Sequence, residues 1–452
     1  NSGRIIAGVT TSNVFRIKSP KILNLNNSGL YTKLSKPNVS AVDLSNSTLV
    51  INRQVTGKTP GSGSLTISTA DALDVAAGIT SAFFEPFDNE RYSIHYNDGT
   101  TETLTGDQVN ITDNGSNITF SGLSQNVACT VNVTLKKVGI ISKSKDFIRS
   151  SQLSITNTVG VSTNSGMSQN SYYGLRVEDK DISLNIPDVV KIHGIFESKD
   201  TSAPTLDRLT FVSGLALDTN TIVGEKIVGK SSRAIGQVVN RVSATEIEFV
   251  YLNANTFSKG ETINFKESSI ETNLQGITSG NYVNRTSNYT LDKGHKKQYS
   301  DYSRIVRKRA SGIPSNQLLI IFDYYKTQSA DSGDLFTANS YTKDRYTTDV
   351  PHIARDRGTD ILDFRPRVNA FDPVAINNKS PFDFNARTFE NITKYVVAPN
   401  ESSIVGYTYY LPRVDKLVIN KNNQVKLVKG VSADNPTPPT EVGDSMEVAQ
   451  IT

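Results

Sequence analysis

The chain has no tryptophan, one cysteine, two methionines and four histidines among its 452 residues. A single cysteine, Cys129, excludes a disulfide within the chain, and its place in the alternating run NVACTVNVTL predicts a buried thiol. The sequence has no run of about 18 apolar residues, so it predicts no membrane-spanning helix. Stability is therefore expected to come from packing or from association with other subunits.

An excess of one charge is also lacking. The chain has 48 Lys and Arg against 44 Asp and Glu, a net charge of +4, and no long run of a single sign. This balance is typical of an ordinary mixed surface and argues against nucleic-acid binding. Hydrophobic residues make up 37% of the chain, below the roughly 45–50% of ordinary globular domains, a range that also counts glycine. Thin sheets with many turns fit this composition better than thick helical cores.

The N-terminal part divides into two predicted segments. Residues 1–60 are rich in Asn, Ser and Lys and predict an extended connector. Residues 61–141 alternate short apolar and polar runs, and the turns Asn97-Asp98-Gly99 and Asp113-Asn114-Gly115 between them predict a small antiparallel β-sandwich. The one helix-like stretch is 69–79, with Thr69 as N-cap and Gly78 past its end.

The middle of the chain predicts a polar arm followed by a second β module. Residues 142–183 are rich in Ser and Asn, and a neighbouring subunit is expected to order them. Residues 184–284 predict a small barrel-like module, in which a G-E-x-I unit occurs twice, at Val223–Gly229 and Lys259–Phe265. The two copies are too short for a solenoid.

The last third is the most distinctive part. Residues 285–431 form a predicted Tyr- and Arg-rich domain, in which QLLIIFDYYK at 317–326 predicts a buried strand covered on both faces. Three prolines within Asn435–Thr440 predict that residues 432–452 form a Pro-rich linker to a further domain. The start without methionine and the end within a strand-like run predict that the chain is a piece of something longer. The predicted fold is mainly β: a string of small antiparallel β-sandwich and barrel modules joined by extended arms and linkers, with few short helices.

Metal sites have little support in the sequence. None of the four histidines has a second ligand at metal-binding spacing, and His95, in the run RYSIHYN, is predicted to be an ordinary strand residue. Asp331 and Asp334 flank Gly333 as in a calcium loop, but an EF-hand-type loop needs more ligands and a terminal glutamate. An Asp-rich turn capped by its own side chains is the favoured interpretation. No metal or cofactor is predicted.

Catalysis is also not predicted. The G-x-S-x-G, P-loop and G-x-G-x-x-G motifs are absent. A glycosidase needs two carboxylates, usually beside aromatic platforms, and the carboxylates of the Tyr- and Arg-rich domain have arginines near them in the sequence: Asp301, Asp323 and Asp363 with Arg304, Arg307, Arg365 and Arg367. Such neighbours lower carboxylate pKa values and favour permanent ion pairs over a general acid. A polysaccharide depolymerase is therefore the least supported alternative.

Several runs occur in a fixed order between Asn288 and Pro439: TLDKGHKKQYSDYSRIVRK, LLIIFDYY, DFRPRV, YYLPRVDKLVIN and KGVSADNPTPP. In this order they resemble virion structural proteins of T4-like marine cyanophages, which carry a shared domain of uncharacterised function in large tail or baseplate polypeptides. The resemblance implies a contractile-tailed phage protein near the baseplate, assembled in many symmetric copies and without known catalysis. It assigns no residue to a reaction.

The sequence therefore predicts a phage virion structural protein of the contractile tail or baseplate region, made in the host cytoplasm, that acts as an assembly and scaffold component. Expected partners are other tail or baseplate proteins and further copies of the chain, with no nucleic acid and no membrane. The alternative is a receptor-binding tail fibre protein that holds host surface polysaccharide in shallow Tyr and Asn sites.

Aromatic and guanidinium side chains are the predicted anchors of a partly buried assembly interface. They are Tyr299, Tyr302, Arg304, Arg307, Tyr324, Tyr325, Arg365, Arg367 and Arg413. On this hypothesis, an Arg365→Ala change blocks particle assembly while the isolated domain still folds.

Overall fold

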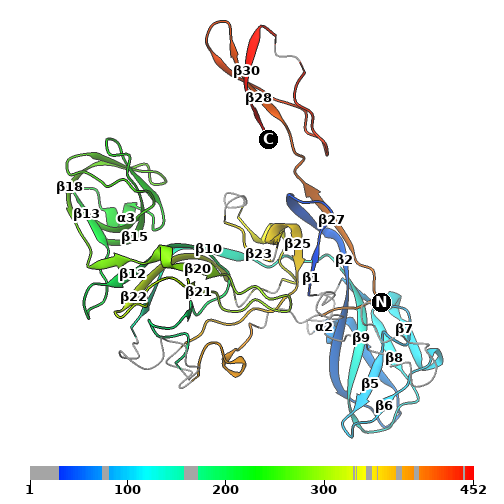
Figure 1. Ribbon diagram of the computed structural model, residues 1–452. Helices are drawn as coiled ribbons and strands as arrows, with labels where there is room; N and C mark the ends of the chain where they lie inside the picture. Colours follow the sequence, from blue (N-terminus) through cyan, green and yellow to red (C-terminus); the bar gives the residue numbers. More distant parts are fainter. Residues whose placement is uncertain are drawn as a thin grey trace.

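The computed structural model describes residues 30–73, 81–156, 172–328, 331, 333–342, 349–353, 355–372, 379–390, 396–440 and 443–452. Over these residues the fold is mainly β, with two short α-helices and several small sheets, one of which closes into a barrel. Figure 1 shows an N-terminal sandwich, a central module, the barrel and a projecting C-terminal sheet. The predicted fold class is confirmed.

The N-terminal sandwich is built on the long antiparallel pair β2 (Val39–Lys58) and β9 (Ala128–Val138). The same sheet contains β4 (Ala82–Phe84), β5 (Ser93–Tyr96), β6 (Thr101–Glu102), β26 (Val396–Val397) and β27 (Ile404–Tyr409). The second sheet contains β3 (Leu65–Ser68), β8 (Asn117–Phe120) and β7 (Val109–Thr112). Two strands of the first sheet thus come from more than 250 positions further along the chain.

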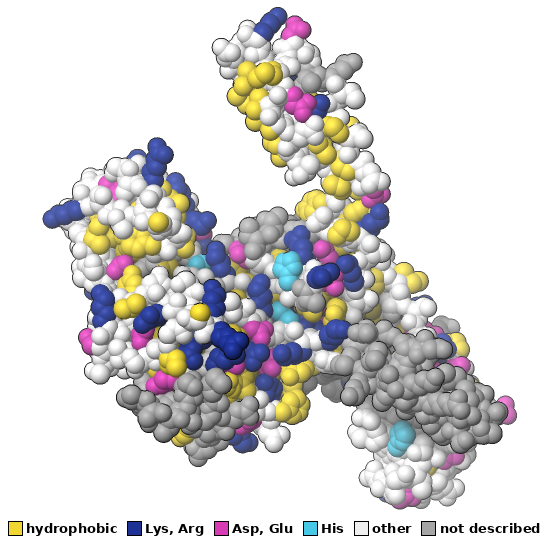
Figure 2. Space-filling model, viewed as in Figure 1, with side chains coloured by type: hydrophobic (Ala, Val, Ile, Leu, Met, Phe, Trp, Pro, Cys, Tyr) yellow, Lys and Arg dark blue, Asp and Glu magenta, His cyan; other side chains and the backbone are white. Residues whose placement is uncertain are grey.

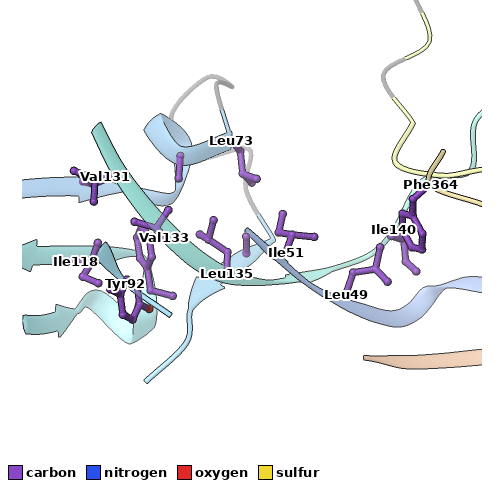
Figure 3. Packing of buried hydrophobic residues seen from close by; sticks show 14 of the residues in the cluster. Leu49, Ile51, Leu73, Tyr92, Ile118, Val131, Val133, Leu135, Ile140 and Phe364 are labelled. Atoms are coloured by element: carbon purple, nitrogen blue, oxygen red, sulfur yellow. The ribbon is translucent and has the colours of Figure 1, made fainter. Parts of the chain in front are cut away.

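Buried side chains of β9 lie at the centre of this core. Figure 3 shows Val131, Val133 and Leu135 along β9, with Leu73 on one side and Ile118 on the other. At the far end of the core Phe364 packs near Ile140, so the sandwich also buries a side chain from the central module.

The N-terminal connector predicted for residues 1–60 is wrong for its second half, because β2 lies inside the sheet. Most positions of this strand are exposed or half-buried and only a minority are buried, so few of them need be apolar and the composition imitates that of a linker. Residues 1–29 lie outside the described residues.

The turns and the helix start of the sandwich follow local sequence signals. Gly99 (φ 90°) lies in the turn between β5 and β6, and Asn114 and Gly115 (φ 55° and 90°) lie in the turn between β7 and β8, which confirms both predicted turns. The helix α2 (Thr69–Leu73) begins where expected. Its cap is Ser68, one residue earlier than predicted, because Ser68 and Asp71 exchange side-chain and backbone hydrogen bonds. Gly78 lies outside the described residues.

The central module has two sheets. One contains β10 (Lys145–Ile155), β22 (Leu318–Thr327), β12 (Val189–Ser198) and β19 (Tyr282–Asn284), in that order. The other contains β11 (Asp181–Ser183), β21 (Arg304–Arg307) and β20 (Tyr289–Asp292). Two short pairs complete the module, β1 (Tyr31–Lys33) with β25 (Ile361–Asp363) and β23 (His352–Ile353) with β24 (Asp356–Arg357).

The polar arm predicted for residues 142–183 is wrong where the structure describes it, because β10 is an edge strand of the central sheet and β11 belongs to the second sheet. An edge strand with exposed side chains needs few apolar residues. Residues 157–171 lie outside the described part of the chain.

The prediction of a strand covered on both faces is confirmed for β22. Leu318, Ile320 and Phe322 point into the core between the two sheets of the central module. Leu319 and Ile321 point the other way, against side chains of the barrel such as Val239 and Val250. The barrel therefore packs directly on this strand.

The barrel spans residues 207–278, and the chain enters it from β12 and leaves it into β19. Its strands close in the order β13 (Asp207–Phe211), β16 (Glu246–Tyr251), β15 (Ile235–Ser243), β14 (Lys226–Gly229), β17 (Thr262–Phe265) and β18 (Glu271–Thr278). The helix α3 (Leu217–Asn220) follows β13. The module is narrower than the predicted 184–284, because both ends of that range belong to the central sheet.

The repeated G-E-x-I unit corresponds to two matching halves of the barrel. Gly224 and Gly260 both have φ of 87°, and the strands that follow them, β14 and β17, pair antiparallel. The Glu225 carboxylate accepts hydrogen bonds from the Glu267 and Ser268 amides, in the turn after β17.

The second copy makes the reciprocal contact. The Glu261 carboxylate accepts hydrogen bonds from the Ser231 and Ser232 amides, in the turn after β14. Each glutamate thus holds the turn of the opposite half.

The three-stranded C-terminal sheet has the order β29 (Val425–Val428), β28 (Asp415–Asn420), β30 (Ser445–Ile451). Asn423 (φ 57°) makes the hairpin turn predicted at 422–423. The linker predicted for 432–452 is wrong for its last part, because β30 pairs with β28 and the prolines lie in the connection between β29 and β30. The predicted 285–431 domain is likewise divided among the central module, the N-terminal sandwich and this sheet.

We expect the two barrel glutamates to be strongly stabilising. Glu261→Ala leaves the amides of the 231–232 turn without their acceptor and should cost about 3 kcal/mol of unfolding free energy. Urea denaturation of the chain measures this. The matched control is Glu246→Ala, which removes a partly exposed ion pair with Arg208 and should change little. Equal effects of the two changes would contradict the assignment.

Candidate functional site

A cluster of five buried charged side chains lies at the centre of the central module. We call Lys145, Asp188, Asp363, Arg365 and Arg367 the ion cluster; none of their side chains is more than 4% exposed. Asp188 accepts from Lys145 Nζ at 3.0 Å and from Arg367 Nε at 2.8 Å. Asp363 accepts from Arg365 Nε and Nη2, both at 2.9 Å. The cluster joins β10, the turn before β12 and the segment after β25.

Aromatic rings enclose the cations of the cluster. The Arg367 guanidinium lies 3.8 Å from the centre of the Phe336 ring, and Lys145 Nζ lies 4.8 Å from the same ring. Lys145 Nζ also donates to the Tyr341 hydroxyl at 2.8 Å. Buried cations that face π-systems and carboxylates are stabilised without water.

Neighbouring cations keep the two carboxylates of the cluster ionised. Burial alone would raise the pKa of Asp188, but Arg367 and Lys145 outweigh it and hold that pKa well below the usual range. Burial lowers the pKa of Lys145 to about 8, and it lowers the pKa of the neighbouring His295 to about 3, aided by the nearby cations. His295 is therefore neutral near pH 7. The side chains of the cluster are closed to solvent and interact with one another.

The nine predicted anchors fall into two groups. Five are buried within the chain: Tyr302, Arg307, Tyr325, Arg365 and Arg367. Four keep exposed surface: Tyr299, Tyr324, Arg304 and Arg413. Contact with another chain stays a prediction for all nine residues. In this conformation only the four residues with exposed surface can contact another chain. Arg365 and Arg367 meet in the ion cluster, with Tyr325 beside Lys145, whereas Arg413 lies apart and pairs with Asp415 at 2.6 Å.

Of the three carboxylates predicted to pair with an arginine nearby in the sequence, one does so. Asp363 pairs with Arg365, and although burial opposes it, this arginine holds the pKa of Asp363 below its usual range. Asp301 pairs with Arg387, 86 positions away, rather than with a nearby arginine. Asp323 accepts from the Ser150 amide and contacts His193 Nε2 at 2.7 Å. Proximity in sequence predicted the pairing only where a tight turn joins the two residues.

The remaining candidate ligands are bound by the chain itself. Asp331 accepts from the amides of Gly333 and Ser144, and Asp334 pairs with Lys137, so both carboxylates of the predicted Asp-rich turn have partners. His95 is a strand residue of β5, as predicted, and its side chain is exposed between buried neighbours. Within the described ranges, no three His, Cys, Asp or Glu side chains converge as a metal site would require.

Sequence reasoning missed Lys145, Asp188, His295 and Tyr341. Lys145 and Asp188 are 43 positions apart, and Asp188 and Arg367 are 179 apart. They lie in four separate segments, and no local pattern indicates that folding brings them together.

A second candidate site is one face of the C-terminal sheet. Opposed residues of neighbouring strands lie on the same face, and the register aligns six apolar side chains, which we call the apolar face: Leu417, Ile419, Val425, Leu427, Met446 and Ala449. Val425 is 65% exposed and Met446 66% exposed. Figure 2 shows hydrophobic side chains along this projecting sheet. The opposite face carries Lys426 and the Lys416–Glu447 ion pair together with Val428 and the buried Val418.

Comparison of the chain with protein-family models, with curated proteins and with solved structures found no match. Among the described residues, no helix is both long enough and apolar enough to cross a membrane. The candidate sites therefore rest on their own geometry.

We expect Arg365 and Arg413 to respond very differently to truncation. Arg365→Ala leaves Asp363 buried without its bidentate partner and should cost about 3–5 kcal/mol, whereas Arg413→Ala removes a largely exposed pair and should change stability little. This differs from the sequence-based expectation that an Arg365→Ala domain folds normally. Thermal unfolding of both variants distinguishes these two expectations. Similar melting temperatures of the two variants would contradict a structural role of Arg365.

Asp188 should make the central module acid-sensitive. Because the folded-state pKa of Asp188 is lowered, its stabilisation is complete above the unfolded pKa of about 3.9 and is lost as the pH falls below it. Asp188→Asn should cost about 3–5 kcal/mol near neutral pH. The difference between wild type and variant should shrink below about pH 4. Urea denaturation across pH measures it, and a constant difference would contradict the prediction.

Proposed function

We propose that the chain is a virion structural protein of a contractile phage tail or baseplate, acting as an assembly and scaffold component without catalysis. The resemblance of Asn288–Pro439 to cyanophage virion proteins supports this placement, with synthesis in the host cytoplasm and other tail or baseplate proteins as partners. The single observation that carries the assembly role is the apolar face of the C-terminal sheet.

An isolated three-stranded sheet with one apolar face open to water is an unfavourable arrangement. Sheets of this size gain their stability from packing that face against another layer. Here Leu417 and Ile419 on the central strand are half-buried, and Val425, Leu427 and Met446 on the two edge strands are exposed. Contiguous exposed apolar surface of this kind marks an interaction site.

We assign a second copy of the chain as the occupant. The six side chains of the apolar face are uncharged, so a partner has to present a flat apolar surface of similar shape, which the same face of another copy does. Two such faces pack about 10 Å apart as a β-sandwich. A stable interface needs at least about 1,000 Å² of buried surface, so contacts next to the six side chains have to contribute.

The position of the sheet permits this pairing. Figure 1 shows it projecting from the rest of the molecule at the end of the segment that follows β27. A second copy can therefore cover the apolar face without displacing the sandwich, the barrel or the central module. Symmetric pairing of this type is the commonest route to homo-oligomers.

The test is the oligomeric state of the whole chain. Wild type should self-associate at micromolar concentrations in analytical ultracentrifugation, and Leu427→Glu should be monomeric, because the change buries an unpaired charge in the interface. The matched control is Lys426→Glu on the opposite face, which should still associate. A monomeric wild type, or equal behaviour of the two variants, would refute self-association through this face. Absence of the chain from purified particles of its phage would refute the virion role.

A further inference from the structure

The central module carries a polar pocket of about 300 Å³ next to the ion cluster. Two of its lining residues, Gly294 and Lys296, flank His295, and the Lys296 carbonyl accepts a hydrogen bond from Arg365. Its walls come from β11, β20 and β21 and from the segment 379–390. Figure 2 shows basic and acidic side chains interspersed over this module. The volume lies at the lower limit of small-molecule sites, so the ligand has to be small.

The charges that line the pocket are balanced. Asp181, Asp292 and Asp301 contribute three negative charges. The lining cations are also three in number: Lys296, Arg304 and Arg387. An anionic ligand would be repelled by the three carboxylates, and a cationic ligand would be repelled by the three cations. The pocket therefore disfavours ligands with a net charge of either sign.

Ion pairs hold these groups in fixed positions. Arg304 binds Asp292 at 2.9 Å, and Arg387 binds both oxygens of Asp301, at 2.7 and 3.0 Å. A carboxylate offers about four acceptor positions and a guanidinium five N–H donors, so both keep hydrogen-bonding capacity toward the pocket. Preorganised donors and acceptors of this kind suit ligands rich in hydroxyl groups.

Aromatic rings supply the apolar part of the wall. The rings of Tyr173 and Phe382 lie 5.6 Å apart, and Tyr302 also lines the pocket. Gly174 (φ 90°) is required here, because a Cβ atom at this position would collide with the Phe382 ring. The Tyr173 hydroxyl donates to Asp181 at 2.9 Å. Burial, together with this bond, raises the pKa of Tyr173 to about 12, so the hydroxyl keeps its proton near neutral pH.

We propose that this pocket binds a single uncharged sugar ring. Pairs of neighbouring hydroxyls match the fixed carboxylate and guanidinium groups, and the C–H faces of the ring pack on the aromatic side chains. An apolar ligand of the same size would leave the lining polar groups desolvated and unpaired. This binding activity is independent of the assembly role and of the apolar face.

The experiment is saturation-transfer NMR and calorimetry on the whole chain with glucose, galactose, mannose and N-acetylglucosamine. Glucuronic acid and glucosamine serve as charged comparators. At least one neutral sugar should bind, and bind more tightly than both charged ones. Asp181→Asn should weaken that binding about tenfold. The matched control is Asp88→Asn, in a separate pocket of the N-terminal sandwich, which should bind as wild type does.

A second variant tests the charge balance without threatening the fold. The Lys296 side chain is exposed, and Lys296→Met leaves the pocket with one excess negative charge, so affinity for glucosamine should rise relative to the neutral sugar. Failure of all four neutral sugars to bind at millimolar concentration would overturn the proposal. So would preference for glucuronic acid, or equal effects of Asp181→Asn and Asp88→Asn.

Discussion

The attraction between Asp188 and its two cations, Lys145 and Arg367, is the interaction on which the centre of the molecule depends. It ties together an edge strand, a turn with positive φ and a segment nearly 180 positions further along the chain. A buried carboxylate is tolerated only when cations pair with it, and a buried cation is tolerated only when a carboxylate pairs with it. Asp363, which shares the cluster, also pairs its backbone with Phe336 and lies in the strand next to β1. The same network therefore joins the central module to the N-terminal segment.

Modules of this chain support one another across long stretches of sequence. The barrel covers one face of β22, whose other face forms the central core. Strands β26 and β27 return to complete the N-terminal sheet, and Phe364 enters its core. The C-terminal sheet differs, because among the described residues the apolar side chains of its edge strands, such as Val425, Leu427 and Met446, stay exposed. The proposed assembly role is based on this difference between modules that bury their apolar faces and a sheet that exposes one.

The apolar face and the polar pocket recognise their partners through different interactions. The apolar face has no charge to orient a partner, so its recognition depends on shape and on the area removed from water. The polar pocket is small, neutral overall and held rigid by ion pairs, so its recognition depends on hydrogen-bond geometry. Neither requires the ion cluster to move.

The sequence by itself determined the β class, the turns at Gly99 and Gly115, the doubly covered strand at 318–327 and the Asp363–Arg365 pair, because each depends on neighbours a few positions apart. The short G-E-x-I repeat also corresponds to two equivalent positions in the barrel, before β14 and before β17. Only the tertiary structure decided that polar, linker-like segments such as 39–58 and 145–155 are strands, and that Arg387 rather than Arg304 binds Asp301. It also decided that Arg365 and Arg367 are buried. These outcomes depend on pairings between distant segments. No short stretch of sequence indicates which charged side chains will be buried together in the low-dielectric interior of the folded protein.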